Sequence, residues 1–548
     1  MGDALSTQYA DLLTGCYDCV DRIVLNAFNG LCYNAGGFRC WWRRLSGSDD
    51  DLDNAHLMRL AGRFARRVHG FARAHQIPVV DCGRGERKRE LAEAYLADHP
   101  EAQGLFMVLV ARAVAPVWEV ARSSAGTLRD LRSKKAFVNH YSFHILDPEW
   151  GHLTIKMSGH PPFGAQVILN GHEYVRLQAA RAGVGYDLAG NAFTRLPEPD
   201  ALAAVADTFS EERMIGRLAA VCDRWIYSSC LCFALHSEDQ ERTGFRYGYS
   251  VYQLEYSRNL LFRDGRQMEQ VFQGLIDRTR GRLAVPDLRT IFGSKHRPHH
   301  DRKDGATQIA VRVETSAYDL TLFKLRFGAL TLKAYTKGEH VLRFEATVHN
   351  AAALGCGRVL PRFPQLVGHL HAMVDRFLDT AWCLDHAFVA DATLEELPAP
   401  AQVGRTRVGG IDLHKPRMRA VLSAVLALAL APGGFRVGNL ARQVQQTGPL
   451  PADRYGTRQA AYDLKKLRAK GFVVPVAGSR RYRASPDGVR TIAALVVLRD
   501  RVIKPILAGT AKPKVGRKPK GYTAVDAHYE ALRKGMLALF ADLGLAAE

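Results

Sequence analysis

A short run near residue 340 combines a tyrosine with basic and acidic residues at the spacing of β-strands. Lys333, Tyr335 and Lys337 alternate along one predicted strand, and Arg343 and Glu345 alternate along the next. Because side chains two positions apart in a strand lie on one face, a hairpin would bring all five together. A tyrosine that attacks a phosphodiester needs cations to lower its pKa and hold the phosphate. These five are therefore candidate catalytic residues for phosphodiester chemistry.

The same run has two further interpretations that stay open. An ion-paired hairpin of this composition can grip a nucleic-acid backbone without cutting it. A metal-dependent nuclease could instead use Glu255, Glu345 and histidines without a covalent step. Replacing Tyr335 separates the mechanisms, because only the covalent one needs the phenol.

A second polar group lies on the hairpin predicted over residues 139–157. The strands NHYSFHIL and HLTIKM flank the turn DPEWG. Alternation puts aromatic and aliphatic side chains on a core face and His140, His144 and His152 on the other, with Lys156. We take these three histidines and Glu255 as candidate ligands of a divalent ion, Mg or Mn, that would polarise the scissile phosphate.

The Lys-Tyr-Lys and Arg-Glu run is similar to the K-x-Y-x-K…L-R-x-E run of phage and plasmid replication proteins of the gene II/X type. Nearly the whole chain resembles a widespread bacterial family associated with mobile elements, whose activity is not settled. This resemblance rests on the same run, on the LNGHE element at Leu169–Glu173 and on the C-terminal part. The similarity to the gene II/X type proteins implies a replication initiator or a transposase-like protein, whereas the resemblance to the bacterial family implies no settled activity. Rolling-circle initiators also carry a His-hydrophobe-His pair on a strand, but His369-Leu370-His371 lies where periodicity predicts a helix.

The C-terminal residues 415–508 have the element order of a winged helix-turn-helix and resemble MarR-like domains in the run YDLKKLRAKG. Thr457–Lys470 is the predicted recognition helix, with Ala461, Leu464 and Leu467 toward the core. A basic segment near residue 515 is similar to an AT-hook. A role in protein docking stays open for this part. The residues expected to contact nucleic acid are Arg458, Gln459, Tyr462, Lys465, Lys466, Arg468, Arg480, Arg481, Arg483, Arg517 and Lys518.

Alternating predicted strands and helices must position these groups, and they indicate a multidomain α+β protein. Residues 1–135 form a predicted N-terminal α/β domain, and residues 136–396 a central antiparallel α+β core. A linker rich in Pro and Gly follows at 397–414. The winged helix-turn-helix occupies 415–508, and a basic tail with a terminal helix occupies 509–548.

Composition indicates the class of partner. The 548 residues include 75 Lys and Arg against 55 Asp and Glu, a net charge of +20, and 47% of them are hydrophobic. That apolar content excludes wholesale disorder, and the charge favours nucleic acid, DNA or structured RNA. The same net charge is also consistent with a non-enzymatic regulator or a ribonucleoprotein component. No apolar run reaches the roughly 20 residues that a membrane helix needs, so we expect a cytoplasmic protein.

Four of the ten cysteines gather near the beginning of the chain: Cys16, Cys19, Cys32 and Cys40. Four thiols within 25 residues could hold a tetrahedral zinc ion. The second pair is separated by seven residues instead of two, and the segment between the pairs reads as a strand. The spacing therefore argues against structural zinc, and we expect reduced thiols.

Overall fold

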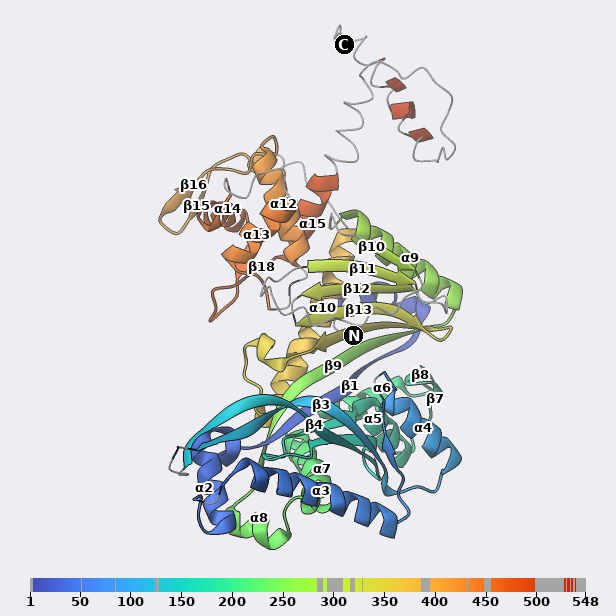
Figure 1. The fold of residues 1–548 in the computed structure, drawn as a ribbon. Coiled ribbons are helices and arrows are strands. Elements are labelled where there is room, and N and C mark those ends of the chain that lie inside the picture. Colours follow the sequence, from blue (N-terminus) through green and yellow to red (C-terminus); the bar gives the residue numbers. More distant parts are fainter. Residues whose placement is uncertain are drawn as a thin grey trace.

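A large mixed sheet organises the molecule (Figure 1). The computed structural model describes residues 3–282, 289–292, 309–315, 321–327, 329–385, 395–447 and 455–497, apart from a few short gaps, and parts of a helix between 527 and 538. Within these residues the sheet has 12 strands in the order β10-β11-β12-β13-β14-β9-β1-β6-β5-β4-β3-β2. Most neighbours are antiparallel, whereas β2 and β3 pair in parallel at one edge, as do β10 and β11 at the other.

The two halves of the sheet repeat one topology on either side of the central antiparallel pair β1–β9. In each half a long strand comes first, the next strand forms the outer edge, and the last strand returns beside the long one. The first half consists of β1 (Leu13–Asn29), β2 (Val79–Asp81), β3 (Gly104–Arg122), β4 (Leu128–Asp147), β5 (Gly151–Ser158) and β6 (Ala165–Asn170). The second consists of β9 (Tyr247–Phe262), β10 (Arg289–Phe292), β11 (Ile309–Thr315), β12 (Thr321–Phe327), β13 (Leu330–Lys337) and β14 (Val341–Val348).

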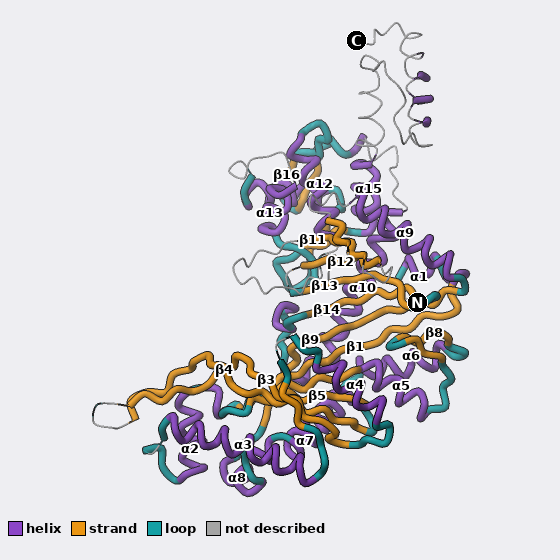
Figure 2. The backbone as a smooth tube through the Cα atoms, turned by 45° about the vertical axis from the view of Figure 1, so that its right-hand side comes forward, coloured by secondary structure: helices purple, strands orange, loops and turns teal. Residues whose placement is uncertain are grey.

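Helices cover the sheet with their apolar sides. In α3 the buried residues Leu57, Leu60, Phe64 and Val68 recur at helical spacing, and Asp53 caps the first turn. Figure 2 shows α2, α3, α7 and α8 grouped beside β3 and β4, while α10 crosses β9 and β14. The helices are α1 (Ala4–Gln8), α2 (Ala35–Ser46), α3 (Asn54–Ala74), α4 (Lys88–Asp98), α5 (Gly171–Arg181), α6 (Pro199–Asp207), α7 (Arg213–Ser229), α8 (Ser237–Thr243), α9 (Gly265–Arg282) and α10 (Phe363–Asp385).

The predicted boundary at residue 135 needs correction. It falls inside β4, which pairs with β3 along its length and with β5 in its second half. Segments 1–135 and 136–396 therefore build one sheet, because long strands joined by backbone hydrogen bonds cross the point where a polar stretch predicted a break. The polar residues of β4 from Asp130 to Lys135 are exposed.

The segment 397–414, predicted as a linker, contains regular secondary structure. It contains a small antiparallel hairpin of β15 (Ala401–Val403) and β16 (Thr406–Val408) with Gly404 in the turn at a φ of 59°. The helices α12 (Pro416–Ala429), α13 (Val437–Thr447), α14 (Thr457–Ala469) and α15 (Pro486–Val497) follow, with β17 (Val473–Pro475) and β18 (Tyr482–Ala484) paired between the last two. This group lies at one end of the molecule in Figure 1, where α15 packs on α10.

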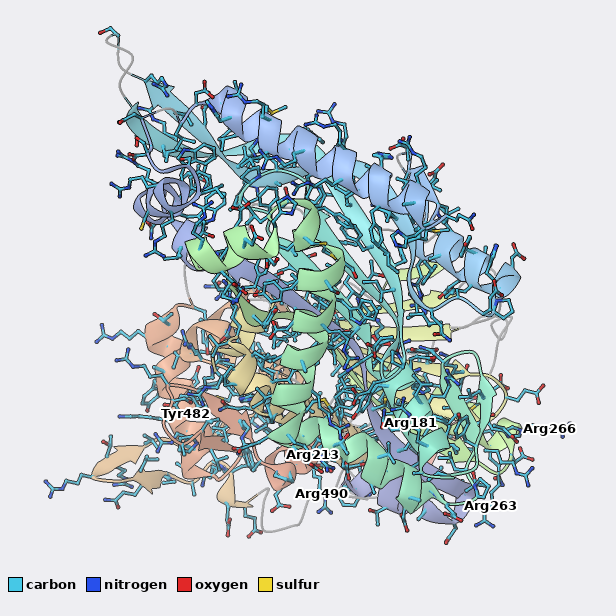
Figure 3. All side chains as sticks on the ribbon, turned by 90° about the horizontal axis from the view of Figure 1, so that it is seen from below. Arg181, Arg213, Arg263, Arg266, Tyr482 and Arg490 are labelled. Atoms are coloured by element: carbon cyan, nitrogen blue, oxygen red, sulfur yellow. The ribbon has the colours of Figure 1, made fainter. Side chains whose placement is uncertain are left out.

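Basic side chains extend from many parts of the surface (Figure 3). Arg213, Arg263 and Arg266 are exposed and project outward there. Among the described residues, no single helix has the length and hydropathy to cross a membrane; the pair Arg213–Phe233 and Ser237–Thr243 has them only jointly and is bent by 103°.

Candidate functional site

The hairpin of β13 and β14 brings the five candidate catalytic residues together. Lys333 lies opposite Glu345, and Tyr335 lies opposite Arg343. The ammonium of Lys333 donates to one oxygen of Glu345, and the Tyr335 hydroxyl donates to the other at 3.0 Å. Lys337 is close enough to Arg343 that burial and this guanidinium lower its pKa to about 8. The predicted cluster is thus present as a geometric unit.

The pKa of Tyr335 differs from the expectation that nearby cations lower it. Burial raises the pKa of the Tyr335 phenol above its usual value, and Glu345 adds to this effect while Arg343 opposes it. Burial also disfavours ionised Glu345, but Lys333 and Arg343 outweigh it and lower the pKa of that carboxyl. The resting state is therefore a neutral phenol that donates to a carboxylate.

Arg343 connects this hairpin to β1. Its side chain is 1% exposed and donates to Asp21, to the Ser257 hydroxyl at 3.1 Å and to the carbonyl of Asn191 at 3.3 Å. Its Nε has no hydrogen-bond partner among the described residues. Arg343 is therefore held by fixed partners while one of its N–H groups stays unused.

Asp21 reaches Arg343 because β1 contains a bulge. Val20 pairs with Tyr256 and Arg22 pairs with Glu255, so Asp21 is an extra residue without a partner on β9. A bulge redirects the side chain of the extra residue and is frequent next to functional sites. Alternation of residue types along β1 gives no sign of it, and sequence analysis missed Asp21.

The LNGHE element, at the end of β6 and the start of α5, packs against the bulge at Val20. The Asn170 side chain caps α5 by accepting from the backbone N–H groups of His172 and Glu173. A Cβ on Gly171 would lie 2.0 Å from the Val20 carbonyl oxygen, so only glycine permits this approach. His172 then stacks on Phe193 with ring centres 4.5 Å apart, and burial lowers its pKa to about 3. The element is needed to hold α5 against β1.

A polar cavity of about 370 Å³ adjoins the cluster. It extends from β4 across β5, β6 and β1 to Glu255 of β9, and α4 supplies another part of its wall. Asp21 belongs both to the cavity wall and to the Arg343 contact. The polar side chains of the wall include Asp21, Arg22, Lys88, Arg89, Glu93, Ser142, His144, His152, Thr154, Lys156, Asn170, Glu173, Asn191 and Glu255.

Strand registers show that the cavity and the cluster share one face of the sheet. His144 opposes Thr154, Thr154 opposes Ile168, and Ile168 opposes Val24. Arg22 lies two residues from Val24 on the same strand. Because directly opposed residues and next-but-one residues point to one side, the face continues unbroken to Arg22.

The same face continues from Arg22 to the catalytic candidates. Arg22 opposes Glu255, which opposes Thr347. Glu345 lies two residues before Thr347 and accepts from its hydroxyl at 3.0 Å. Burial, and next the charge of Glu345, raise the pKa of Glu255 to about 6. The two polar groups predicted from separate hairpins thus form one polar face, which we call the open face.

The four candidate metal ligands are only partly brought together. His144, His152 and Glu255 line the cavity, with His144 Nδ1 3.0 Å from His152 Nε2. Burial lowers the pKa of His144 to about 3 and of His152 to about 4, so both are neutral at neutral pH. His140 lies apart, with Nδ1 3.3 Å from the Val138 carbonyl oxygen. The described residues contain no group of three or more His, Cys, Asp or Glu that could hold a metal ion.

The cysteine cluster is spread over three elements. Cys16 and Cys19 lie on β1, Cys32 lies in a short 3-10 helix and Cys40 lies in α2. All four are free thiols, and Cys19 and Cys32 are buried. Burial raises the pKa of Cys16 and Cys32 to about 12. The thiols of Cys16 and Cys32 are therefore protonated at neutral pH.

The helix predicted at residues 457–470 corresponds to α14, but its buried side differs from the prediction. Leu464 and Leu467 are buried, whereas Ala461 is exposed and Asp463 is buried instead. Asp463 is tolerated there because Arg417 donates two hydrogen bonds to it at 2.9 and 2.8 Å. Hydrophobic periodicity does not predict that a polar residue will be buried in such an ion pair.

The predicted nucleic-acid contacts have different surroundings. Tyr462 and Lys466 lie beside the segment that follows β16, where Lys466 donates to the Gly410 carbonyl at 3.1 Å. Gln459 accepts from the Gly456 N–H at 3.1 Å and so completes a helix cap. Arg468 stacks on Tyr482 with its guanidinium carbon 5.9 Å from the ring centre. The residues that remain exposed are Arg458, Tyr462, Lys465, Arg480 and Arg483. Arg481 is half-buried, and Arg517 and Lys518 lie outside the described residues.

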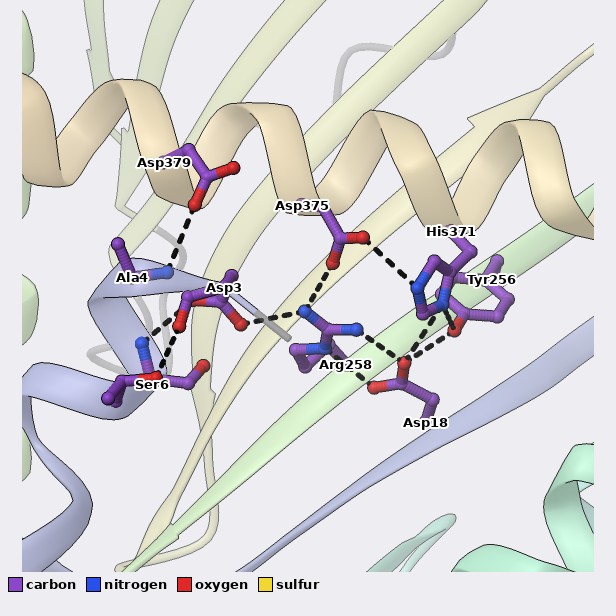
Figure 4. Close-up of polar contacts among 10 residues, drawn as sticks. Asp3, Ala4, Ser6, Asp18, Tyr256, Arg258, His371, Asp375 and Asp379 are labelled. Atoms are coloured by element: carbon purple, nitrogen blue, oxygen red, sulfur yellow. Dashed lines mark hydrogen bonds and ion pairs between the residues drawn. The ribbon is translucent and has the colours of Figure 1, made fainter. Parts of the chain in front are cut away.

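A second buried network, missed by sequence analysis, lies on the opposite side of β9 (Figure 4). Arg258 donates to Asp3 at 2.7 Å, to Asp375 at 2.6 Å and to both oxygens of Asp18 at 2.8 and 2.7 Å. These contacts keep the pKa of Asp18 well below its usual range despite burial. His371 belongs to this network and lies in helix α10, as its periodicity predicts.

Comparison with protein-family models, with curated proteins and with solved structures gives no match for this chain.

Proposed function

We propose that the protein binds nucleic acid and processes a phosphodiester on the open face, as a replication initiator or transposase-like protein of a mobile element or plasmid. The observation that carries this proposal is the polar face that runs from the cavity to the Tyr335–Glu345 pair. The net charge of +20 supports a polyanionic partner. The resemblance of the Lys-Tyr-Lys and Arg-Glu run to phage and plasmid replication proteins supports the same class.

The pair has the arrangement of a nucleophile and its base. The phenol oxygen of Tyr335 forms a bond to phosphorus while the bond from phosphorus to one sugar oxygen breaks. Glu345 accepts the phenol proton, and solvent protonates the departing sugar oxygen. Because burial raises the phenol pKa, this transfer to Glu345 has to accompany the attack. Arg343 and Lys337 would stabilise negative charge on the phosphate.

A divalent ion, Mg or Mn, belongs to the proposal as a partner of Glu255. Magnesium is commonly bound by one or two carboxylates together with substrate phosphates, so a preformed cage of protein ligands is not required. The ion would polarise the scissile phosphate. The neutral imidazole of His152 lies in the same cavity wall as a further candidate metal ligand.

Site recognition is assigned to the C-terminal part. The order α12, α13, α14 and the β17–β18 hairpin supports a winged helix-turn-helix, with α14 as recognition helix. Exposed Arg458 and Lys465 would contact DNA from α14, and Arg480 and Arg483 from the wing. Lys465→Gln should weaken binding at all sequences and reduce the salt slope by about 1 if Lys465 meets a phosphate.

Binding without cleavage is the second candidate. The observation that favours it is the hydrogen bond that holds a neutral Tyr335 phenol on Glu345. A protein of this kind would be a regulator or a ribonucleoprotein component, and DNA or structured RNA would be its partner.

Cleavage assays with end-labelled DNA and RNA, single-stranded and duplex, test the proposal. With Mg or Mn present, the full chain should give a cut strand and a covalent adduct on a denaturing gel. Tyr335→Phe and Glu345→Ala should lose at least about 100-fold in rate while affinity changes little. Tyr33→Phe, whose side chain is 77% exposed, is the matched control.

Other outcomes point elsewhere. Tight binding with no product from any substrate supports the non-enzymatic function. Cleavage that survives Tyr335→Phe but stops on chelation identifies a metal-dependent nuclease without a covalent step.

A further inference from the structure

We propose that the cationic end of the cavity, at Lys88, Lys156 and Arg22, is a binding site for the phosphate group of a nucleotide. Lys156 comes from β5, Arg22 from β1 and Lys88 from the first turn of α4. The site deepens the proposed function, and it rests on that function for the idea that the nucleotide belongs to a strand being processed. The phosphate chemistry itself is argued from the cavity.

The acids of the cavity wall are more completely paired than two of its cations, Lys88 and Lys156. The acids Glu93, Glu173 and Asp21 each have a cationic partner, which is Arg89, Arg176 and Arg343 respectively. The fourth acid of the wall, Glu255, lies opposite Arg22, whose charge opposes the rise in the Glu255 pKa. Lys88 and Lys156, in contrast, form no ion pair with a carboxylate among the described residues.

The three cations also act on one another. Burial lowers the pKa of Lys156, and Lys88 and Arg22 lower it further. Grouped like charges in a recess cost free energy unless an anion joins them. A ligand that binds at this end of the cavity is therefore expected to carry negative charge.

Neutral donors surround the same end. Lys88 donates to the Ser142 hydroxyl at 3.1 Å, and the Thr154 hydroxyl lies 3.4 Å from His144 Nδ1. His144 is 2% exposed, and its Nε2 has no hydrogen-bond partner among the described residues. If His144 Nδ1 accepts from its neighbours, Nε2 carries the proton and is a donor that lacks an acceptor. Arg22 Nε is likewise buried and unpartnered.

These groups match a phosphate better than a carboxylate. A phosphate offers at least two anionic oxygens and further acceptor positions, which suits two ammonium groups, a guanidinium, hydroxyls and an imidazole N–H. The volume of about 370 Å³ lies in the range of small-ligand sites and leaves space for a sugar and base beside the phosphate. The acidic end, at Glu255, faces the Tyr335–Glu345 pair.

Binding is tested by calorimetry and thermal unfolding of the full chain with inorganic phosphate, with chloride at equal ionic strength as baseline. Phosphate should raise the midpoint of unfolding of the wild type by about 2–4 °C at saturation. Lys156→Gln and Lys88→Gln should each weaken phosphate binding about 10- to 100-fold. Lys135→Gln, an exposed lysine on β4, is the matched control and should bind as wild type.

A deoxynucleoside 5′-monophosphate and a short single-stranded oligonucleotide should both displace phosphate. If the monophosphate binds more tightly, the phosphate comes from a free nucleotide. If the oligonucleotide binds more tightly, the phosphate belongs to a strand. Phosphate binding that neither can displace would overturn the nucleotide assignment. No binding above the chloride baseline, or equal binding by Lys156→Gln and wild type, would overturn the site.

Failure of this inference is distinguishable from failure of the proposed function. Tyr335 does not line the cavity, so Tyr335→Phe should still bind phosphate. If the wild type binds phosphate through Lys156 but forms no adduct and cuts nothing, the site stands and the proposed chemistry fails. If adducts form and phosphate does not bind, the chemistry stands and the site fails.

Discussion

Strand β9 carries a buried polar network on each side, and the two networks differ in how completely they are paired. On the α10 side, Arg258 donates to three carboxylates, and Tyr256 and His371 complete the contacts. On the open face, a buried oxygen of Asp21 and the Nε atoms of Arg22 and Arg343 have no partner among the described residues. Cavities adjoin both networks, so the difference lies in the pairing. A network whose charges are paired stabilises the fold, whereas one with unused donors is arranged for a ligand.

The α10 network also links distant parts of the chain. Asp3 caps α1 through the Ser6 N–H at 2.7 Å, and Asp379 accepts from the Ala4 N–H at 3.0 Å. Together with Arg258, these contacts fasten the N-terminal segment to α10 and β9 (Figure 4). Its role is therefore structural.

The largest predicted effect is the removal of Arg258. Arg258→Met leaves the buried carboxylate of Asp3 without a cation and that of Asp18 with His371 alone, and should lower the free energy of unfolding by about 3–5 kcal/mol. Denaturant titration followed by circular dichroism measures it. A loss below about 1 kcal/mol would mean that the two networks do not differ as described.

Glu345→Gln should act mainly on chemistry. The amide keeps the volume of the side chain but is a poor base for the Tyr335 proton, so the cleavage rate should fall about 100-fold. The unfolding free energy should fall by less than in Arg258→Met, because Lys333, the partner left behind, is partly exposed. If Arg258→Met and Glu345→Gln lost stability and activity to the same extent, the proposed difference between the two networks would be wrong.

The pH dependence of stability should have opposite signs on the two sides. Hydrogen bonds with Asp18 and Asp375 raise the pKa of His371 to about 9, against about 6.5 when unfolded. That stabilisation is fully present below about pH 6.5 and is lost as the pH rises through 9. His371→Gln should therefore cost about 1 kcal/mol at pH 6, since the ring is half-exposed, and nothing at pH 10.

The open face should respond in the other direction. His144 has a lowered folded-state pKa of about 3, so the unfolded chain binds the proton more readily and stability falls as the pH drops below about 6.5. His144→Gln should lessen the loss between pH 6 and 4. Unfolding titrations over this range check both signs, and equal pH profiles for the two histidine variants would contradict the assignment.

The smallest predicted effect is a gain. Lys156→Gln removes one of three mutually repelling cations and should raise the midpoint of unfolding by about 1–2 °C without phosphate. Lys135→Gln should leave it unchanged. A decrease in Lys156→Gln would show that Lys156 has a stabilising partner and would weaken the contrast between the two sides.

Local patterns predicted much of the open face. Alternation placed His144 with Thr154 and Lys156 correctly, because burial of one hairpin face fixes the side of every residue. It also placed Tyr335 and Glu345 together, since both strands belong to one hairpin. The proposed roles of these residues stay predictions.

Contacts between segments that lie far apart in the chain could not be predicted from local sequence patterns. The pairing of β1 with β9 joins residues more than 200 positions apart, and it alone brings Asp21 to the open face and Asp18 to Arg258. The bulge at Asp21 breaks the alternation that a pattern would use. Burial of Asp463 and the course of β4 through residue 135 likewise depend on tertiary pairing.

The central claim is that Tyr335 of the open face is the residue that joins nucleic acid. The most direct test is to digest the protein after reaction with labelled DNA and Mg, and to identify the nucleotide-bearing peptide by mass spectrometry. The structure-based account predicts one modified peptide, from β13, with the phosphate on Tyr335, and the same result in Tyr256→Phe, which alters the opposite side of β9. A modified residue elsewhere, or active cleavage that leaves Tyr335 unmodified, would contradict it.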